Sequence, residues 1–83
     1  MQVRILFFAS VKEATGLTHD VIIIQQPNLA SLKRELELRH ESIVNILPSC
    51  MFAVDNEYVH DLNQEIVDLD KKEIALIPPI SGG

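Results

Sequence analysis

The first stretch of the chain has the apolar alternation of a β-strand. Val3, Ile5 and Phe7 occupy every second position and are β-branched or aromatic, which predicts a strand with this side in the core. Leu6 and Phe8 are apolar too, so the other side of the strand is expected to be covered or used for contact.

A second strand is predicted over residues 19–25, which contain four consecutive β-branched residues. Between the two strands, Ser10 and Glu13 have the spacing of a helix capping box, with Ser10 at the N-cap and Glu13 at N3. Gly16 suits the position that ends a helix. We therefore expect antiparallel strands joined by a short helix over 11–15, with a simple turn as the alternative.

One long amphipathic helix is predicted over residues 28–41. Asn28 is a good N-cap residue, and Leu29, Leu32 and Leu36 recur at the spacing of one helix face. Because charged residues fill the opposite side, the leucine side is expected to cover one face of the sheet.

The second half of the chain predicts three more strands, at 51–54, 57–60 and 73–77. Asp55 and Asn56, between the first two of them, are typical of a two-residue hairpin turn.

Two connecting segments are harder to interpret. Residues 42–49 are ambiguous, because Ile43, Val44, Ile46 and Leu47 are apolar but Pro48 ends whatever element forms there. Residues 61–72 are mostly polar, and the connection that they form is expected to be anchored by three apolar side chains, Ile66, Val67 and Leu69.

This order of elements is typical of an α+β roll. If the first and last strands are central neighbours, the sheet is mixed, has four or five strands, and carries the one long helix on one face. That is the ubiquitin-like β-grasp arrangement. We expect residues 1–77 to form this domain and residues 78–83, called the tail below, to project from it.

The tail combines two prolines with two terminal glycines. Pro78 and Pro79 end a strand, because each fixes φ and lacks a backbone N–H. After Ile80-Ser81, the Gly82-Gly83 tip is slim enough for a channel that any Cβ would block. A frayed terminus is the alternative.

An apolar patch is predicted on the side of the sheet that faces away from the long helix. Neighbouring first and last strands would place Leu6, Phe8 and Ile77 together there, at the base of the tail. Such a patch is typical of a protein interface. The alternative is that the segment 42–49 folds over it.

Composition limits the kinds of partner. The 83 residues carry a formal net charge of −5 and are 47% hydrophobic, as in a globular domain with one small core. Because no stripe of Lys and Arg occurs, no nucleic-acid partner is expected. No stretch predicts a membrane span. The lone Cys50 fits a reducing compartment, which predicts the cytosol.

No catalytic or metal-binding constellation is expected. His19, His40 and His60 lack the spacing of metal ligands and are predicted to be solvated polar residues. Cys50 has no activating base beside it in the sequence and is predicted to be a half-buried structural thiol.

Three stretches together carry a resemblance to a known family. Residues 5–16 begin with Ile-Leu-Phe-Phe-Ala, residues 52–59 contain Phe-Ala-Val and Glu-Tyr-Val, and residues 73–83 end in Pro-Pro-Ile-Ser-Gly-Gly. The whole chain resembles the small, sulfur-carrier subunit of molybdopterin synthase, most of all its eukaryotic form. Lys71-Lys72 departs from this family, which commonly has a Gly-Asp turn there.

The resemblance implies a defined chemistry at the end of the tail. An E1-like adenylyltransferase would use ATP to adenylate Gly83, and a rhodanese-like sulfur donor would convert the glycyl adenylate to a thiocarboxylate. The tail, with Gly82 at its tip, would then deliver sulfur to cyclic pyranopterin monophosphate in the large subunit, which forms the molybdopterin dithiolene of the molybdenum cofactor.

The resemblance also implies the assembly. Two small and two large subunits would form a heterotetramer, in which the small subunit binds no cofactor and catalyses nothing by itself. The expected partner-binding residues are Leu6, Phe8, Ile77, Pro78, Pro79, Ile80 and Ser81. The alternative is a related ubiquitin-like sulfur carrier of tRNA thiolation or the thiamine pathway, or a protein modifier that joins Gly83 to lysines.

Overall fold

The computed structural model describes residues 1–79 of the chain. In this range the helices and strands follow one another as β1 (Gln2–Phe7), α1 (Ala9–Thr15), β2 (His19–Ile23), α2 (Leu29–Arg39), β3 (Met51–Val54), β4 (Glu57–Val59) and β5 (Ile74–Ile77).

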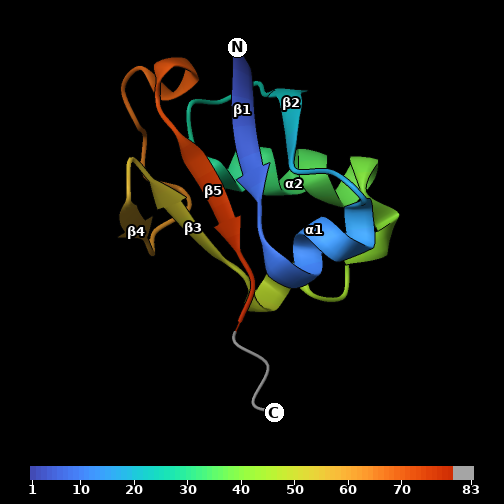
Figure 1. The fold of residues 1–83 in the computed structure, drawn as a ribbon. Helices are drawn as coiled ribbons and strands as arrows, with labels where there is room; N and C mark the ends of the chain where they lie inside the picture. The colour runs from blue at the N-terminus through green and yellow to red at the C-terminus, as the bar shows by residue number, and fades with distance from the viewer. Residues whose placement is uncertain (80–83) are drawn as a thin grey trace.

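The strands form a single mixed sheet in the order β2-β1-β5-β3-β4 (Figure 1). The two central strands, β1 and β5, are parallel, with Leu6 opposite Ala75 and Phe7 opposite Leu76. The other three pairs are antiparallel. The prediction that the first and last strands are central neighbours is therefore confirmed. The α+β, β-grasp fold is confirmed with it.

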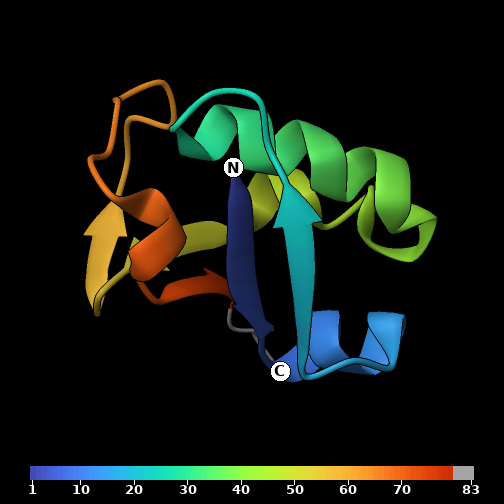
Figure 2. The same cartoon turned by 90° about the horizontal axis from the view of Figure 1, so that it is seen from above.

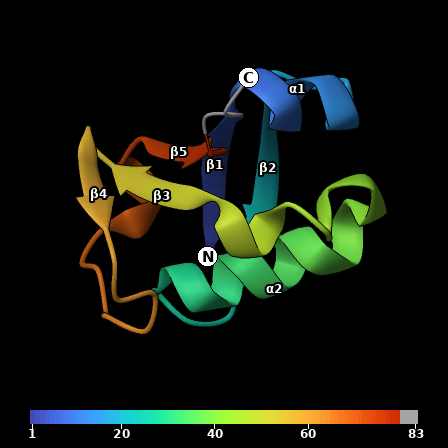
Figure 3. The ribbon, with the colours of Figure 1, turned by 90° about the horizontal axis from the view of Figure 1, so that it is seen from below.

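Helix α2 packs on one face of this sheet, as Figures 2 and 3 show from opposite sides. Asn28 caps it, because the Asn28 Oδ1 accepts a 2.9 Å hydrogen bond from the Ser31 backbone N–H. Leu29, Leu32 and Leu36 are fully buried, which confirms the predicted leucine face. Around them lies the rest of the core, mainly alternate residues of the strands: Val3, Ile5, Phe7, Ile22, Phe52, Ile74 and Leu76.

The short helix α1 confirms a predicted element but not its predicted start. The helix begins at Ala9, and the N-cap is Phe8, whose side chain makes no capping hydrogen bond. The prediction of Ser10 as the N-cap was wrong, because buried Val11 and the turn at Ala9 decide where the helix begins. Gly16 ends the helix with a left-handed φ of 73°, as predicted.

The hairpin turn between β3 and β4 is also confirmed. Asp55 and Asn56 both have positive φ, at 49° and 70°, as a type I′ turn requires.

The ambiguous segment 42–49 lies on the α2 side of the sheet. It contains parts of two short 3-10 helices, Glu41–Ile43 and Leu47–Ser49, and Ile43 and Leu47 are buried in the core. The segment therefore does not cover the opposite face of the sheet.

Three apolar side chains anchor the connection before β5, but they are not the predicted three, because Leu62 replaces Val67. Leu69, in the 3-10 helix Leu69–Lys71, is fully buried, and Ile66 packs against the core. The expectation for Val67 was wrong, because 74% of its surface is exposed. Leu62 packs against the core instead, and its carbonyl accepts a 2.8 Å hydrogen bond from the Ala30 N–H at the start of α2.

The sheet face opposite α2 is called the outer face here. The strand registers place on it alternate residues that are exposed or half-buried: Gln2, Arg4, Leu6, His19, Val21, Ile23, Met51, Tyr58, Ala75 and Ile77. Most of them are apolar, so this face is a candidate contact surface.

Candidate functional site

The base of the tail lies at the end of a central strand. Strand β5 ends at Ile77, after which Pro78 is buried and Pro79 is exposed. The remaining predicted tail residues, Ile80, Ser81, Gly82 and Gly83, lie outside the described residues.

A mostly apolar groove of about 510 Å³ opens beside the base of the tail. Because α1 starts directly after β1, the groove has one wall from this helix and another from the end of β5. We call it the tail-base groove, and its lining residues are Phe8, Ala9, Ser10, Glu13, Ile77, Pro78 and Pro79.

The groove brings together four of the predicted partner-binding residues. Phe8 is 46% exposed and shares the groove with half-buried Ile77 and with Pro78 and Pro79. Leu6 does not line it. Leu6 is half-buried on the outer face, opposite Ala75, and borders a separate hollow with Arg4 and residues 70–73.

The strand-to-helix junction explains why two adjacent phenylalanines have different surroundings. Phe7 is 2% exposed and Phe8 continues the extended backbone, with φ −129° and ψ 155°, so its side chain points the other way. The backbone N–H groups of Val11 and Lys12 then donate to the Phe8 carbonyl at 3.0 and 3.3 Å. These bonds fold α1 back beside Phe8.

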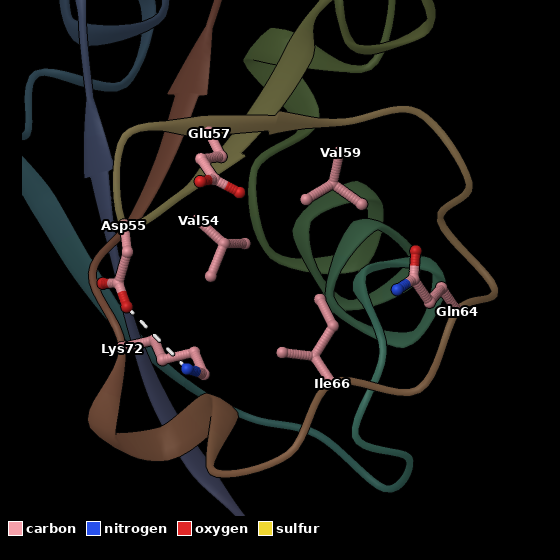
Figure 4. A pocket seen from close by; sticks show the side chains of 7 residues that line it. All are labelled: Val54, Asp55, Glu57, Val59, Gln64, Ile66 and Lys72. Carbon is pink, nitrogen blue, oxygen red and sulfur yellow. Dashed lines mark ion pairs between the residues drawn. The ribbon is translucent and has the colours of Figure 1, made fainter.

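A third hollow, of about 340 Å³, lies between the β3–β4 hairpin and the connection 61–72. Figure 4 shows Val54, Val59 and Ile66 around it, with Glu57 and Gln64 near its rim. No predicted site residue belongs to it.

An ion pair ties the turn of this hairpin to the start of β5. The Lys72 Nζ lies 3.8 Å from the Asp55 Oδ2 (Figure 4). The Asp55 Oδ1 also accepts a 2.9 Å hydrogen bond from the Glu73 backbone N–H. Lys72, at a position where the sequence departs from the family pattern, thus contributes to the turn before β5.

The sequence did not predict a polar cluster at the edge strand β2. His40 Nε2 lies 2.7 Å from the Asp20 Oδ2, and Arg39 Nε lies 3.9 Å from the same oxygen. The His40 ring also meets Phe7 edge to face, with centroids 5.6 Å apart. The prediction of His40 as a solvated residue was wrong, since only 15% of its side chain is exposed.

Electrostatics at this cluster favour the ionised carboxylate. Burial alone would raise the pKa of Asp20, but the hydrogen bonds from His40 and the Val21 N–H and the charge of Arg39 outweigh it and lower that pKa. No spacing rule could have found the cluster, because Asp20 and His40 are 20 residues apart and meet only when α2 packs on the sheet.

Cys50 is a half-buried thiol, as predicted. Its Sγ donates a 3.2 Å hydrogen bond to the Ile46 carbonyl. Burial raises the pKa of this thiol against the opposing charge of Lys33, which disfavours the nucleophilic thiolate.

The described residues 1–79 lack both a metal-binding cluster and a membrane-spanning helix. They contain no group of three or more His, Cys, Asp or Glu side chains placed to hold a metal ion. None of their helices combines the length and the apolarity needed to cross a bilayer.

Several solved structures share this fold. SAMP1 from Haloferax volcanii superposes with a TM-score of 0.82 at 17% sequence identity, with all of both chains covered. A chain in the complex of subunits 1 and 2 of the molybdopterin-converting factor from Helicobacter pylori gives a TM-score of 0.71 at 25% identity, again over both whole chains.

Sequence comparison extends the similarity beyond the fold. The molybdopterin synthase sulfur carrier subunit of Homo sapiens is 41% identical over 83 residues, which cover 99% of this chain and 94% of that protein. The subunit of the same name from Dictyostelium discoideum is 38% identical, with 99% and 96% covered. The model of the ThiS family matches residues 5–83. With this match over almost its whole length, on a β-grasp sheet that ends at the base of a Gly-Gly tail, the chain belongs to the ThiS family.

Proposed function

We propose that this chain is the sulfur carrier subunit of a molybdopterin synthase. The observation that carries the proposal is the full-length identity of 41% and 38% to two subunits of that name. The Gly82-Gly83 ending and the fold, which directs the last central strand toward the tail, support it.

The proposed chemistry takes place at the carboxylate of Gly83. A carboxylate is a poor electrophile, so an E1-like enzyme first joins it to AMP from ATP, and pyrophosphate leaves. The persulfide sulfur of a rhodanese-like donor then attacks the glycyl carbonyl and displaces AMP, which gives an acyl disulfide between Gly83 and the donor. A thiol of the donor enzyme reduces this bond, so that the thiocarboxylate is released and a disulfide stays on the donor enzyme. The thiocarboxylate is anionic and nucleophilic at neutral pH, as a thiolate is, and it would transfer its sulfur to cyclic pyranopterin monophosphate.

The proposed partner at this step is the large subunit of the synthase, in a heterotetramer of two small and two large subunits. The tail would enter the active site of the large subunit. There the thiocarboxylate and the substrate would be held close together and correctly oriented. The tail-base groove, with Phe8 and Ile77, would dock beside the entrance. The solved complex of two subunits of the converting factor from Helicobacter pylori supports this arrangement. The assembly would work in the cytosol.

The mass of the intact chain tests the proposal. After incubation with the activating enzyme, ATP and a sulfur donor, we expect a gain equal to the exchange of one oxygen for one sulfur at Gly83. The matched control carries one extra alanine after Gly83, which moves the terminal carboxylate and should block loading. An unchanged mass for the parent chain would refute the sulfur-carrier function.

A protein modifier, the alternative from a different class, makes a different prediction. It would form conjugates of higher mass between Gly83 and lysines of other proteins in a cell lysate. Such conjugates, in the absence of sulfur loading, would favour the modifier.

A further inference from the structure

Among the described residues with positive φ, Ala9 is the one that is neither Gly, Asp nor Asn. In this part of the chain, positive φ occurs at four non-glycine positions, and three of them are Asp55, Asn56 and Asp68. Asp and Asn tolerate this conformation because their short polar side chains bond locally, whereas alanine lacks that compensation. Ala9 nevertheless has φ 46°.

The chain uses glycine for the same conformation only seven residues later. Gly16, at the other end of α1, has φ 73°, which glycine adopts without strain. Ala9 therefore keeps a methyl group at a position where glycine would fold more easily.

The turn at Ala9 builds one wall of the tail-base groove. It lies between extended Phe8 and the rest of α1, where Val11 is fully buried. These neighbours hold the turn in place, and α1 consequently brings Glu13 to the same groove as Phe8 and Ile77.

We infer that Ala9 is a positioning residue for partner binding, which holds Phe8 in a single orientation beside the tail. Strained backbone persists where the surrounding structure enforces it, and it gathers at functional sites. Here the strain falls directly beside the exposed aromatic ring. This inference rests on the proposed function, in which Phe8 contacts the large subunit.

Glycine at position 9 should stabilise the fold but weaken binding to the large subunit. The variant Ala9→Gly removes the strain, so the folded chain should become more stable. It also lets the junction visit more conformations, so that binding must order Phe8 again.

Two variants test the inference. Ala9→Gly is compared with Asn56→Gly, which places glycine at another position of positive φ (70°) in the β3–β4 turn, away from the groove. Three quantities are measured for the parent and both variants: the thermal midpoint, the ¹⁵N order parameter of the Phe8 amide, and the Kd for the purified large subunit of molybdopterin synthase at fixed salt.

We expect Ala9→Gly to raise the midpoint by about 2–6 °C, to lower the order parameter of Phe8, and to weaken binding by about three- to fivefold. Asn56→Gly should change neither the order of Phe8 nor the Kd.

An unchanged order parameter at Phe8, or an unchanged Kd in Ala9→Gly, overturns the inference. So does an equal loss of affinity in Asn56→Gly, because the effect would then come from backbone freedom in general. Failure of the parent chain to bind the large subunit refutes the proposed function and the partner role of Ala9 with it. The order parameter then still shows whether Ala9 fixes Phe8.

Discussion

Some residues near the base of the tail are buried in the core and stabilise the fold, whereas others are exposed to solvent. Phe7 and Phe8 are adjacent, yet Phe7 is buried against His40 while nearly half of Phe8 is exposed. Strand alternation predicted that the two rings point to opposite sides of β1. The left-handed turn at Ala9 was not predicted, because no composition rule expects alanine in that conformation.

The variant Phe8→Asp tests the exposed ring. A charge in the tail-base groove should weaken binding to the large subunit by about 10- to 100-fold, as for an aromatic residue at the centre of an interface. The thermal midpoint should change little, because the Phe8 side chain already meets water. Calorimetric titration and a melting curve measure the two effects.

The control is Leu38→Asp, which introduces the same charge at a residue of α2 that is 75% exposed and does not line the groove. Its Kd should match that of the parent. If Phe8→Asp unfolds the domain, Phe8 belongs to the core and its assignment to the interface is wrong.

The carboxylate of Asp20 should stabilise the fold in a manner that depends on pH. Its pKa in the folded chain lies below the ordinary 3.8, so the stabilisation is fully present above that pH and is lost as the pH falls through the lowered pKa. At pH 7, Asp20→Asn should cost about 1 kcal/mol, or about 4–8 °C in the thermal midpoint.

Melting curves of Asp20→Asn and the parent from pH 7 down to pH 2 provide the measurement. The gap between the two midpoints should shrink below the ordinary carboxyl pKa. A gap of the same size at all pH values would show that Asp20 contributes through its shape and neutral hydrogen bonds instead of its charge.

At the scale of elements, local patterns predicted the strands and α2 well. The leucine spacing in α2 and the Asp-Asn turn are signals contained within a few residues, and both were confirmed. The start of α1 was missed, because burial of Val11 outweighs the local capping pattern. The 3-10 turns of 41–49 were also missed, since their shape depends on how Ile43 and Leu47 reach the core.

The two candidate caps should respond differently to alanine. Asn28→Ala removes the 2.9 Å hydrogen bond to the Ser31 N–H and should cost about 1 kcal/mol of unfolding free energy. Ser10→Ala removes no capping bond and should cost less than about 0.5 kcal/mol.

Urea unfolding of the two variants measures this difference. Equal costs for Asn28→Ala and Ser10→Ala would mean that the Ser10 hydroxyl caps α1 in solution.

At the scale of the whole molecule, the folding core and the proposed reacting end occupy different parts of the sequence. The buried hydrophobic core extends from Val3 to Leu76. A chain that ends at Pro79 should therefore keep the thermal midpoint of the parent and lose sulfur loading completely.

Melting curves and intact masses of this truncated chain check both expectations. A core variant, Leu32→Ala, serves as the opposite control, because it should lose about 2–5 kcal/mol of stability and still be loaded while folded. Sulfur loading of the truncated chain would place the reactive group somewhere other than Gly83.

The parallel pairing of β1 with β5 also sets the order in which the domain can form during synthesis. Strand β1 is made first, but its central neighbour is translated only almost 70 residues later. Contacts this distant in sequence form late. The edge of β1 that pairs with β5 therefore stays without its partner strand until β5 has been made. Any chain cut short before Ile74 lacks the centre of its sheet, so premature products remain unfolded and open to proteolysis.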